Sequence, residues 1–169
     1  MRLSNHAEKR GSQKRAPRNV SKKSSLPERI LLIEDDENFA QMLACALEQR
    51  GGSDVMVAAE AFEASNLMSQ QAFDLVVTDW RLPAINGFGA LRKAEQCLSL
   101  DPMAPQEWFG RHKVPVIVIT ACDLSEIEGE RRLKGCFQFL GVVSKEQAMT
   151  GILQQIEILF ENAPFSSTG

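Results

Sequence analysis

Short, continuous apolar runs alternate with segments of helical periodicity along most of the chain. Five runs are typical of strands: residues 30–33, 55–58, 74–78, 116–120 and 137–143. They show little alternation of polar and apolar positions, which is expected of parallel strands that are buried on both faces. The run 116–120 (VIVIT) gives the strongest signal, because β-branched Val and Ile favour strands. The pattern therefore predicts a sheet of five buried strands.

Amphipathic helices are predicted between these runs. In residues 39–47 apolar positions recur every three or four residues, and the pattern stops at Gly51 and Gly52, as at a glycine C-terminus. Further helices are expected in residues 62–68, 87–98, from 125 to about 135, and from 144 to 160. Ser125 with Glu128, and Ser144 with Gln147, match capping boxes that would begin the last two.

Strands that alternate with crossover helices require a parallel sheet with helices on both faces. The fold class predicted is α/β, a flavodoxin-like (βα)5 doubly wound parallel sheet with strand order 2-1-3-4-5. Ligands of such sheets bind outside the carboxyl ends of the strands. The residues expected at those ends are Glu34, Asp35, Asp36, Asp79, Thr120 and Lys145.

Gathered at one edge, these acidic side chains would repel each other, and a divalent cation would resolve the conflict. Carboxylate oxygens without Cys or His ligands favour a hard ion such as Mg²⁺. Lys145 adds an ammonium for an anion, and Thr120 adds a hydroxyl donor. Together these groups indicate a site for a phosphoryl group on Asp79.

Simpler roles exist for each residue. Asp36 can cap the first helix, Thr120 can be a β-branched strand residue, and Lys145 can be a solvated lysine in the first turn of a helix. The joint occurrence of the set at the expected strand ends favours a site. The chain carries no glycine-rich phosphate-binding motif, which argues against a nucleotide or flavin cofactor.

Four segments carry a family resemblance: ILLIEDDE (30–37), LVVTDWRLPAING (75–87), VIVITA (116–121) and VVSK (142–145). In order and spacing they resemble the receiver domain of two-component response regulators, over about residues 28–161. The resemblance implies that Asp79 is the phosphoacceptor, that Thr120 is the switch hydroxyl and that Lys145 contacts the phosphoryl group. It also implies that Glu34, Asp35, Asp79 and the Arg81 backbone carbonyl hold Mg²⁺.

The partners implied are a sensor histidine kinase or a histidine phosphotransfer protein, together with a downstream protein target. A homodimer is left open. By the same resemblance, catalysis is limited to the Mg²⁺-dependent phosphorylation and dephosphorylation of the chain itself. The function expected is that of a stand-alone phosphoacceptor that signals by binding, because no effector domain follows Phe160.

Three departures from the family pattern leave an alternative open. Val142 stands where receivers often carry an aromatic residue, and Glu146 stands where a proline commonly follows the lysine. An inserted loop of about residues 99–113 carries Trp108 and Phe109, which either fold back onto the domain or form a partner-binding lobe. In this alternative, the chain is a receiver-like interaction module that no longer switches.

Three regions are predicted: a basic tail, residues 1–27, a domain that resembles receivers, residues 28–163, and a polar end, residues 164–169. Charge distinguishes the tail from the rest. Residues 1–25 carry eight basic residues and one acidic residue, a net charge of +7, whereas the rest of the chain is about −10. The tail composition predicts disorder. A nucleic-acid binder that uses this tail is a further alternative. No apolar segment is long enough for a membrane span or a signal peptide, so a cytoplasmic location is expected.

Overall fold

The computed structural model describes residues 25–109, 113–123, 125–128, 133 and 135–164. Its main feature is a five-stranded parallel sheet in the order β2-β1-β3-β6-β7. The strands are β1 (Arg29–Ile33), β2 (Asp54–Ala58), β3 (Leu75–Asp79), β6 (Val114–Thr120) and β7 (Phe137–Ser144). In chain order of these long strands this is 2-1-3-4-5, which confirms the predicted flavodoxin-like topology. A small antiparallel hairpin, β4 (Arg81–Leu82) with β5 (Ile85–Asn86), was not predicted.

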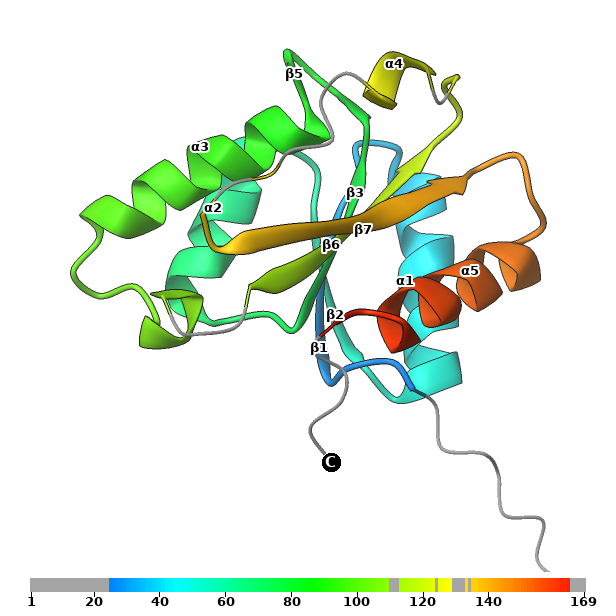
Figure 1. The fold of residues 1–169 in the computed structure, drawn as a ribbon, viewed down its shortest axis with the longest axis horizontal. Coiled ribbons are helices and arrows are strands. Elements are labelled where there is room, and N and C mark those ends of the chain that lie inside the picture. Colours follow the sequence, from blue (N-terminus) through cyan, green and yellow to red (C-terminus); the bar gives the residue numbers. More distant parts are fainter. Residues whose placement is uncertain (1–24, 110–112, 124, 129–132, 134, 165–169) are drawn as a thin grey trace, which may run out of the picture.

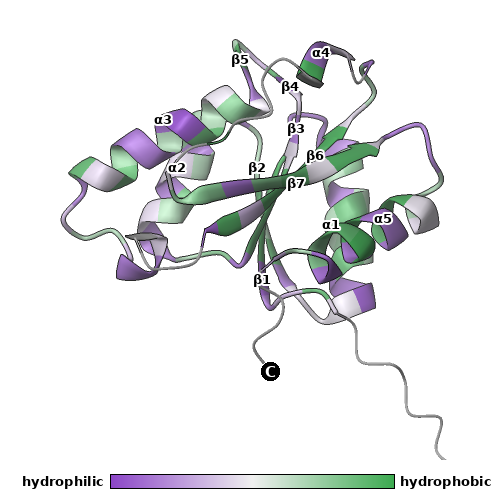
Figure 2. Cartoon of the chain, in the orientation of Figure 1, coloured by the Kyte–Doolittle hydropathy of each residue, from purple (hydrophilic) through white to green (hydrophobic). Residues whose placement is uncertain are grey.

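Helices cover both faces of the sheet (Figure 1). They are α1 (Glu37–Gly51), α2 (Ala61–Gln70), α3 (Gly87–Leu100), the short α4 (Ser125–Glu128) and α5 (Met149–Glu161). Alternate strand residues enter two cores: Leu32 and Val77 pack with α1 and α5, whereas Leu31 and Val76 pack with α2 and α3. Hydrophobic residues accordingly run along β6 and β7 (Figure 2). Burial on both faces explains why the strands lack a polar alternation.

Both predicted capping boxes are wrong. Ser144 is the last residue of β7, and α5 begins five residues later, at Met149 after Ala148, with no side-chain cap. Ser125 already lies inside α4, and the Asp123 carboxylate accepts a hydrogen bond from its backbone N–H at 3.0 Å. The helix was predicted to continue to about Gly135, and residues 129–132 and 134 of that stretch lie outside the described part of the chain.

The inserted segment folds back onto the domain through Trp108. This indole lies in a 3-10 turn, Gln106–Phe109, and is 1% exposed. Its Nε1 donates to the backbone carbonyl of Met68 at 2.8 Å, and its ring packs against Phe73 and Phe137. The segment therefore covers the amino end of the sheet, which confirms the expected folding back for Trp108.

The ends of the chain lie mostly beyond the described residues. Residues 1–24 of the basic tail, for which disorder is predicted, lie outside that part. Residues 165–169 of the polar end lie outside it as well. From Leu26, which is 8% exposed, the chain packs into the core that α1 and α5 cover. Among the described residues, no helix combines the length and apolar character that a membrane span requires.

Candidate functional site

The parallel register brings four polar side chains to the carboxyl edge of the sheet. Glu34 directly follows β1, Asp79 and Thr120 end β3 and β6, and Lys145 directly follows β7. Asp79 pairs in register with Ile119, the neighbour of Thr120, and the Lys145 N–H donates to the Thr120 carbonyl at 2.9 Å. Glu34, Asp79 and Thr120 are 2%, 7% and 1% exposed. The structure thus brings together the residues that the sequence predicts at the strand ends.

Lys145 is the centre of this cluster. Its Nζ lies 2.7 Å from Asp79 Oδ2, with which it makes a hydrogen bond, and 2.6 Å from Glu34 Oε2. The ammonium also stands over the Phe39 ring, 4.6 Å from the centroid, a cation–π contact. No sequence pattern pointed to a contact between Phe39 and Lys145, because the helical spacing of Phe39 indicates only a core residue. Lys145 is therefore fixed by three partners from two strand ends and α1.

Burial and ion pairing act in opposite directions on the titration of this cluster. Burial by itself lowers the pKa of Lys145, but its hydrogen bonds and charge interactions with Asp79 and Glu34 outweigh burial, so the pKa is raised. Burial raises the pKa of Glu34 in spite of its contact with Lys145. Lys145 thus stays cationic at neutral pH, and it compensates two carboxylates that are costly to bury.

Asp35 completes an acidic group with Glu34 and Asp79. One carboxylate oxygen from each residue lies within 4.8 Å of the other two. Glu34 Oε2 is buried and has the Lys145 ammonium as its ion-pair partner, whereas the exposed Asp35 opens the group to solvent. Three hard oxygen donors in reach of one another fit the requirements of Mg²⁺, which takes few protein carboxylates and keeps several waters. This chemistry agrees with the metal set predicted from the sequence.

Asp36, the third acidic residue after β1, is not part of this group. Its side chain accepts a hydrogen bond from the Phe39 N–H at 3.0 Å and caps α1. This arrangement is the helix-capping role considered from the sequence. Its own N–H donates to Glu34 Oε1 at 3.1 Å, so the cap also orients the buried carboxylate of the cluster.

The loop after Asp79 is shaped by the β4–β5 hairpin. The Arg81 N–H donates to Asp79 Oδ1 at 3.2 Å, and the Arg81 side chain leaves the site to pair with Glu126 in α4 at 2.8 Å. Gly87 closes the loop with a hydrogen bond to the Trp80 carbonyl, and a Cβ at this position would collide with the Asp79 backbone carbonyl. Arg81 therefore lies beside Asp79, while the ligand role of its carbonyl stays a prediction.

The side of the site formed by β6 and β7 contains Thr120 and Val142. The Thr120 hydroxyl accepts a hydrogen bond from the Cys122 N–H at 3.0 Å, which holds the start of the following loop. Val142 is half-buried and packs against the core that α2 and α3 cover. The sequence also did not reveal the Arg81–Glu126 pair, which links the loop after Asp79 to α4 across 45 residues.

Two curated relatives match the chain, both described as "Probable transcriptional regulator ycf29". The protein of Pyropia yezoensis is 28% identical over 66% of this chain and 45% of its own length. The protein of Porphyra purpurea is 24% identical over 75% of this chain and 55% of its own length. The chain thus spans about half the length of the curated relatives that it matches.

Solved structures similar to the chain are receiver domains and a chemotaxis protein. The receiver domain of the Francisella response regulator 1452 is 26% identical, with a TM-score of 0.54, over 80% of this chain and 98% of that one. Vibrio cholerae CheY4 is 20% identical, with a TM-score of 0.61, over 78% and 98% of the two chains. The receiver domain of the Pseudomonas aeruginosa sensor histidine kinase PA1611, described with magnesium in its active-site cleft, is 24% identical, with a TM-score of 0.55, over 78% and 95%.

A family model gives the most extensive match. Residues 30–157 match the model described as the response regulator receiver domain, and this range contains all four segments singled out in the sequence. The match also contains each residue of the carboxyl-edge cluster, from Glu34 to Lys145. The chain therefore belongs to the response regulator receiver domain family.

Proposed function

We propose that this chain is a phosphoacceptor that takes a phosphoryl group from a phosphohistidine onto Asp79. The observation that carries the proposal is the position of Lys145 Nζ, 2.7 Å from Asp79 and 2.6 Å from Glu34, at the edge where Thr120 also ends its strand. A fixed ammonium beside this buried carboxylate can form charge-assisted hydrogen bonds with the phosphoryl oxygens once the carboxylate is phosphorylated.

The transfer is a substitution at phosphorus. An Asp79 carboxylate oxygen forms the new O–P bond while the P–N bond to the histidine breaks, and the imidazole nitrogen that leaves takes up a proton. Lys145 then contacts a phosphoryl oxygen, and the Thr120 hydroxyl can donate to another. Hydrolysis by water reverses the modification, so catalysis by the chain is restricted to its own phosphorylation and dephosphorylation.

Glu34, Asp35, Asp79 and the Arg81 backbone carbonyl would hold Mg²⁺ in this proposal. Bound there, the ion supplies positive charge that neutralises the oxygens of the transferring group. Glu34 and Asp79 support this role, because the two buried carboxyl groups share one ammonium, and a second cation would balance the remaining negative charge of the acidic group.

The proposed donors are a sensor histidine kinase or a histidine phosphotransfer protein, and the proposed output is phosphorylation-dependent binding of a protein target or of a second copy of the chain. A cytoplasmic location accords with such partners. The matching relatives are named probable transcriptional regulators, yet the chain covers only about half of their length. We therefore assign to this chain the receiving step and leave the output to the partner it binds.

Intact mass measurement tests the proposal. After incubation with Mg²⁺ and acetyl phosphate or phosphoramidate, the protein is expected to gain the mass of one phosphoryl group. Chelation of the metal and Asp79→Asn should each abolish the gain, and Asp101→Asn, a change at a half-buried acidic residue outside the site, should leave it unchanged. A protein that stays unmodified with both donors and with a phosphorylated phosphotransfer domain would refute the proposal.

The second candidate, a module that no longer switches, rests on Val142. This small side chain is half-buried and has no ring that could turn from an exposed to a buried position. Hydrogen exchange with Mg²⁺ and beryllofluoride, a phosphoryl mimic, separates the two candidates. Changes in protection confined to residues 79–88 favour the module, whereas changes through residues 120–146 that Thr120→Ala removes favour a regulator that switches.

A further inference from the structure

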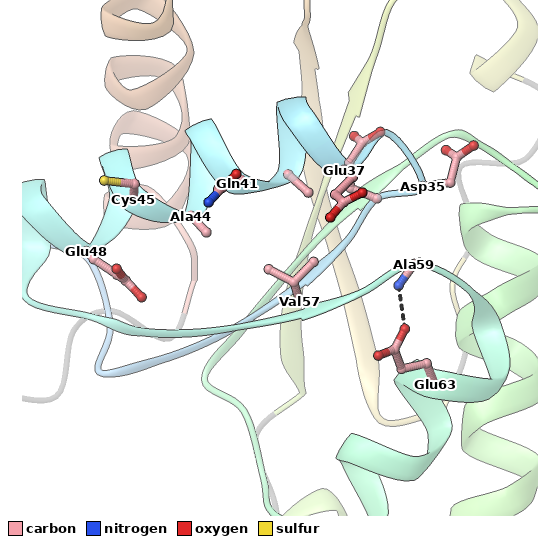
Figure 3. Close-up of a pocket in the computed structure, with 11 residues that line it drawn as sticks. Asp35, Glu37, Gln41, Ala44, Cys45, Glu48, Val57, Ala59 and Glu63 are labelled. Carbon is pink, nitrogen blue, oxygen red and sulfur yellow. Dashed lines mark hydrogen bonds between the residues drawn. The ribbon is translucent and has the colours of Figure 1, made fainter.

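A groove of about 720 Å³ lies between α1 and the edge strand β2 (Figure 3). Its floor is formed by small apolar side chains, among them Ala40, Ala44 and Val57. At one end lies Glu48, near the C-terminus of α1, and at the other lie Asp35 and Glu34 of the acidic group. The groove therefore leads from the base of α1 to the proposed Mg²⁺ site.

The groove has a strongly acidic rim. Asp35, Glu37 and Glu48 are exposed there, and none of them has a hydrogen-bond or ion-pair partner among the residues that the structure describes. Glu63 adds a fourth carboxylate, which accepts a hydrogen bond from the Ala59 N–H at 2.8 Å. Within the described part of the chain, no lysine or arginine lines the groove. A surface with an apolar floor and uncompensated negative charge favours an extended basic segment as its occupant.

Such a segment begins at the Glu48 end of the groove. The described chain starts at Ser25, and the next residues are held beside the turn between α1 and β2: Ser53 Oγ donates to the Pro27 carbonyl at 2.7 Å, and the Asp54 N–H donates to the Glu28 carbonyl at 2.6 Å. The 24 residues before Ser25 include all eight basic residues of the tail. The tail thus enters beside the groove that is complementary to it in charge.

The spacing of the charges matches the length of the groove. Glu37 and Glu48 are eleven residues apart on one helix, or about 16 Å at 1.5 Å per residue. Lys22 and Lys23 stand three and two residues before Ser25, within reach of Glu48. Arg18 stands seven residues before it, which in an extended chain is about 23 Å at 3.3 Å per residue, and so reaches Glu37 and Asp35.

We propose that the basic N-terminal segment of this chain docks into its own α1–β2 groove and opposes Mg²⁺ binding at Glu34 and Asp35. Since the two are joined by a short stretch of chain, the contact is intramolecular and has a high effective concentration. Its strength comes from exposed charges, so salt weakens it. The segment is then an autoinhibitory contact, which a competing acidic partner of the tail would release.

Zero-length crosslinking with a carbodiimide tests the docking directly, because it joins an ammonium and a carboxylate only when they touch. In the full chain at low salt, Lys22 and Lys23 are expected to crosslink to Glu48, and in the variant Arg18→Lys the amine at position 18 is expected to crosslink to Glu37 or Asp35. Glu107 and Glu161 serve as controls, because they are exposed carboxylates outside the groove. A mixture of ¹⁴N- and ¹⁵N-labelled chains distinguishes intramolecular from intermolecular links.

Crosslinks that concentrate on the groove within one chain and disappear in 0.5 M salt would support the proposal. Crosslinks spread equally over Glu107 and Glu161, or formed mainly between differently labelled chains, would overturn it. The second of these outcomes would instead assign the groove to a second copy. This test requires neither phosphorylation nor metal, so it can fail or succeed independently of the proposed function.

Calorimetric titration with Mg²⁺ tests the opposition, which rests on the proposed metal site. The triple variant Arg18→Gln, Lys22→Gln and Lys23→Gln is expected to bind Mg²⁺ about threefold more tightly than the wild type at low salt, as for one screened charge pair removed. The matched variant Arg2→Gln, Lys9→Gln and Arg10→Gln loses the same charge at the other end of the segment and should keep the wild-type affinity. If the two triple variants bind Mg²⁺ with the same affinity, whether or not it differs from that of the wild type, the competition is refuted.

Discussion

The amino and carboxyl ends of the parallel strands differ in how their buried polar groups are paired. At the amino end, the buried Trp108 packs against Phe73 and Phe137, and its only polar atom donates to the Met68 carbonyl. At the carboxyl end, the buried carboxyl groups of Glu34 and Asp79 share the ammonium of Lys145, and the exposed Asp35 adds a third carboxylate. The polar atom at the amino end is paired within the chain, whereas the acidic group at the carboxyl end exceeds its one cationic partner and favours a cation from solvent. The packing at the amino end therefore stabilises the fold, and the polar cluster at the carboxyl end depends on that stability to keep its geometry.

Removal of the Trp108 ring should have the largest effect. Trp108→Ala leaves a cavity at the amino end and is expected to lower the free energy of unfolding by about 3–5 kcal/mol. Because the residue lies far from the acidic group, Mg²⁺ should not restore the loss. Urea denaturation with and without Mg²⁺ measures both quantities.

Trp108→Phe serves as the matched control, since it keeps most of the buried ring and loses only the donor to Met68. Its expected cost is about 1–3 kcal/mol. An equal loss in both variants would show that the hydrogen bond, and not the packing, secures the insertion. A loss below 1 kcal/mol for Trp108→Ala would contradict the assignment of this end as a stabilising core.

Lys145→Ala breaks the compensation at the other end. Two carboxylates then face each other without a cation, and the expected loss of stability without metal is about 3 kcal/mol. Unlike the loss at Trp108, most of it should return in excess Mg²⁺, which replaces the missing positive charge. Thermal denaturation with EDTA and with Mg²⁺ gives the comparison.

Arg50→Ala is the control for this experiment, because it breaks an exposed ion pair with Glu157 outside the site. Exposed pairs contribute little, so neither its stability nor its response to Mg²⁺ should change noticeably. If Mg²⁺ leaves Lys145→Ala as unstable as EDTA does, the cluster is a structural ion pair and not a metal site.

A smaller effect distinguishes the ends by pH. Burial and the neighbouring Glu95 raise the pKa of Cys136, just before β7, to about 12. The folded thiol therefore stays neutral while the unfolded thiol ionises near pH 9, so this residue's contribution to stability is present below pH 9 and is lost as the pH rises toward 12. Alkylation at pH 8.5 should label the exposed Cys45 and Cys97 well before Cys136. Equal labelling rates in the folded protein would contradict this.

The sequence allowed the strand order and the cluster at the carboxyl edge to be predicted, because both follow from local runs and from the rule that parallel strands end together. Glu34, Asp79, Thr120 and Lys145 each stand at the end of an apolar run. No local pattern could reveal that the Trp108 indole bonds to Met68, 40 residues away. The same holds for the cation–π contact of Lys145 with Phe39, which depends on how α1 packs.

Helix starts were the least predictable feature. Ser144 and Gln147 match a capping box, yet β7 continues to Ser144 because its backbone pairs in register with Thr120. The strand predicted over residues 116–120 likewise begins earlier in the structure, where β6 starts at Val114 and includes Pro115. A proline is tolerated there because the pairing with β3 starts only at Val116, so its missing N–H interrupts no bond on that side. In both places tertiary pairing overrides a local signal.

The central claim is that the carboxyl end is completed by a cation, and a comparison of melting temperatures tests it most directly. Mg²⁺ at one hundred times its Kd should stabilise the wild type by about 2.7 kcal/mol through mass action. Asp35→Asn removes an exposed carboxylate of the acidic group, so its melting temperature without metal should not fall, and most of the Mg²⁺-dependent increase should disappear. An increase in Asp35→Asn equal to that of the wild type would contradict the account.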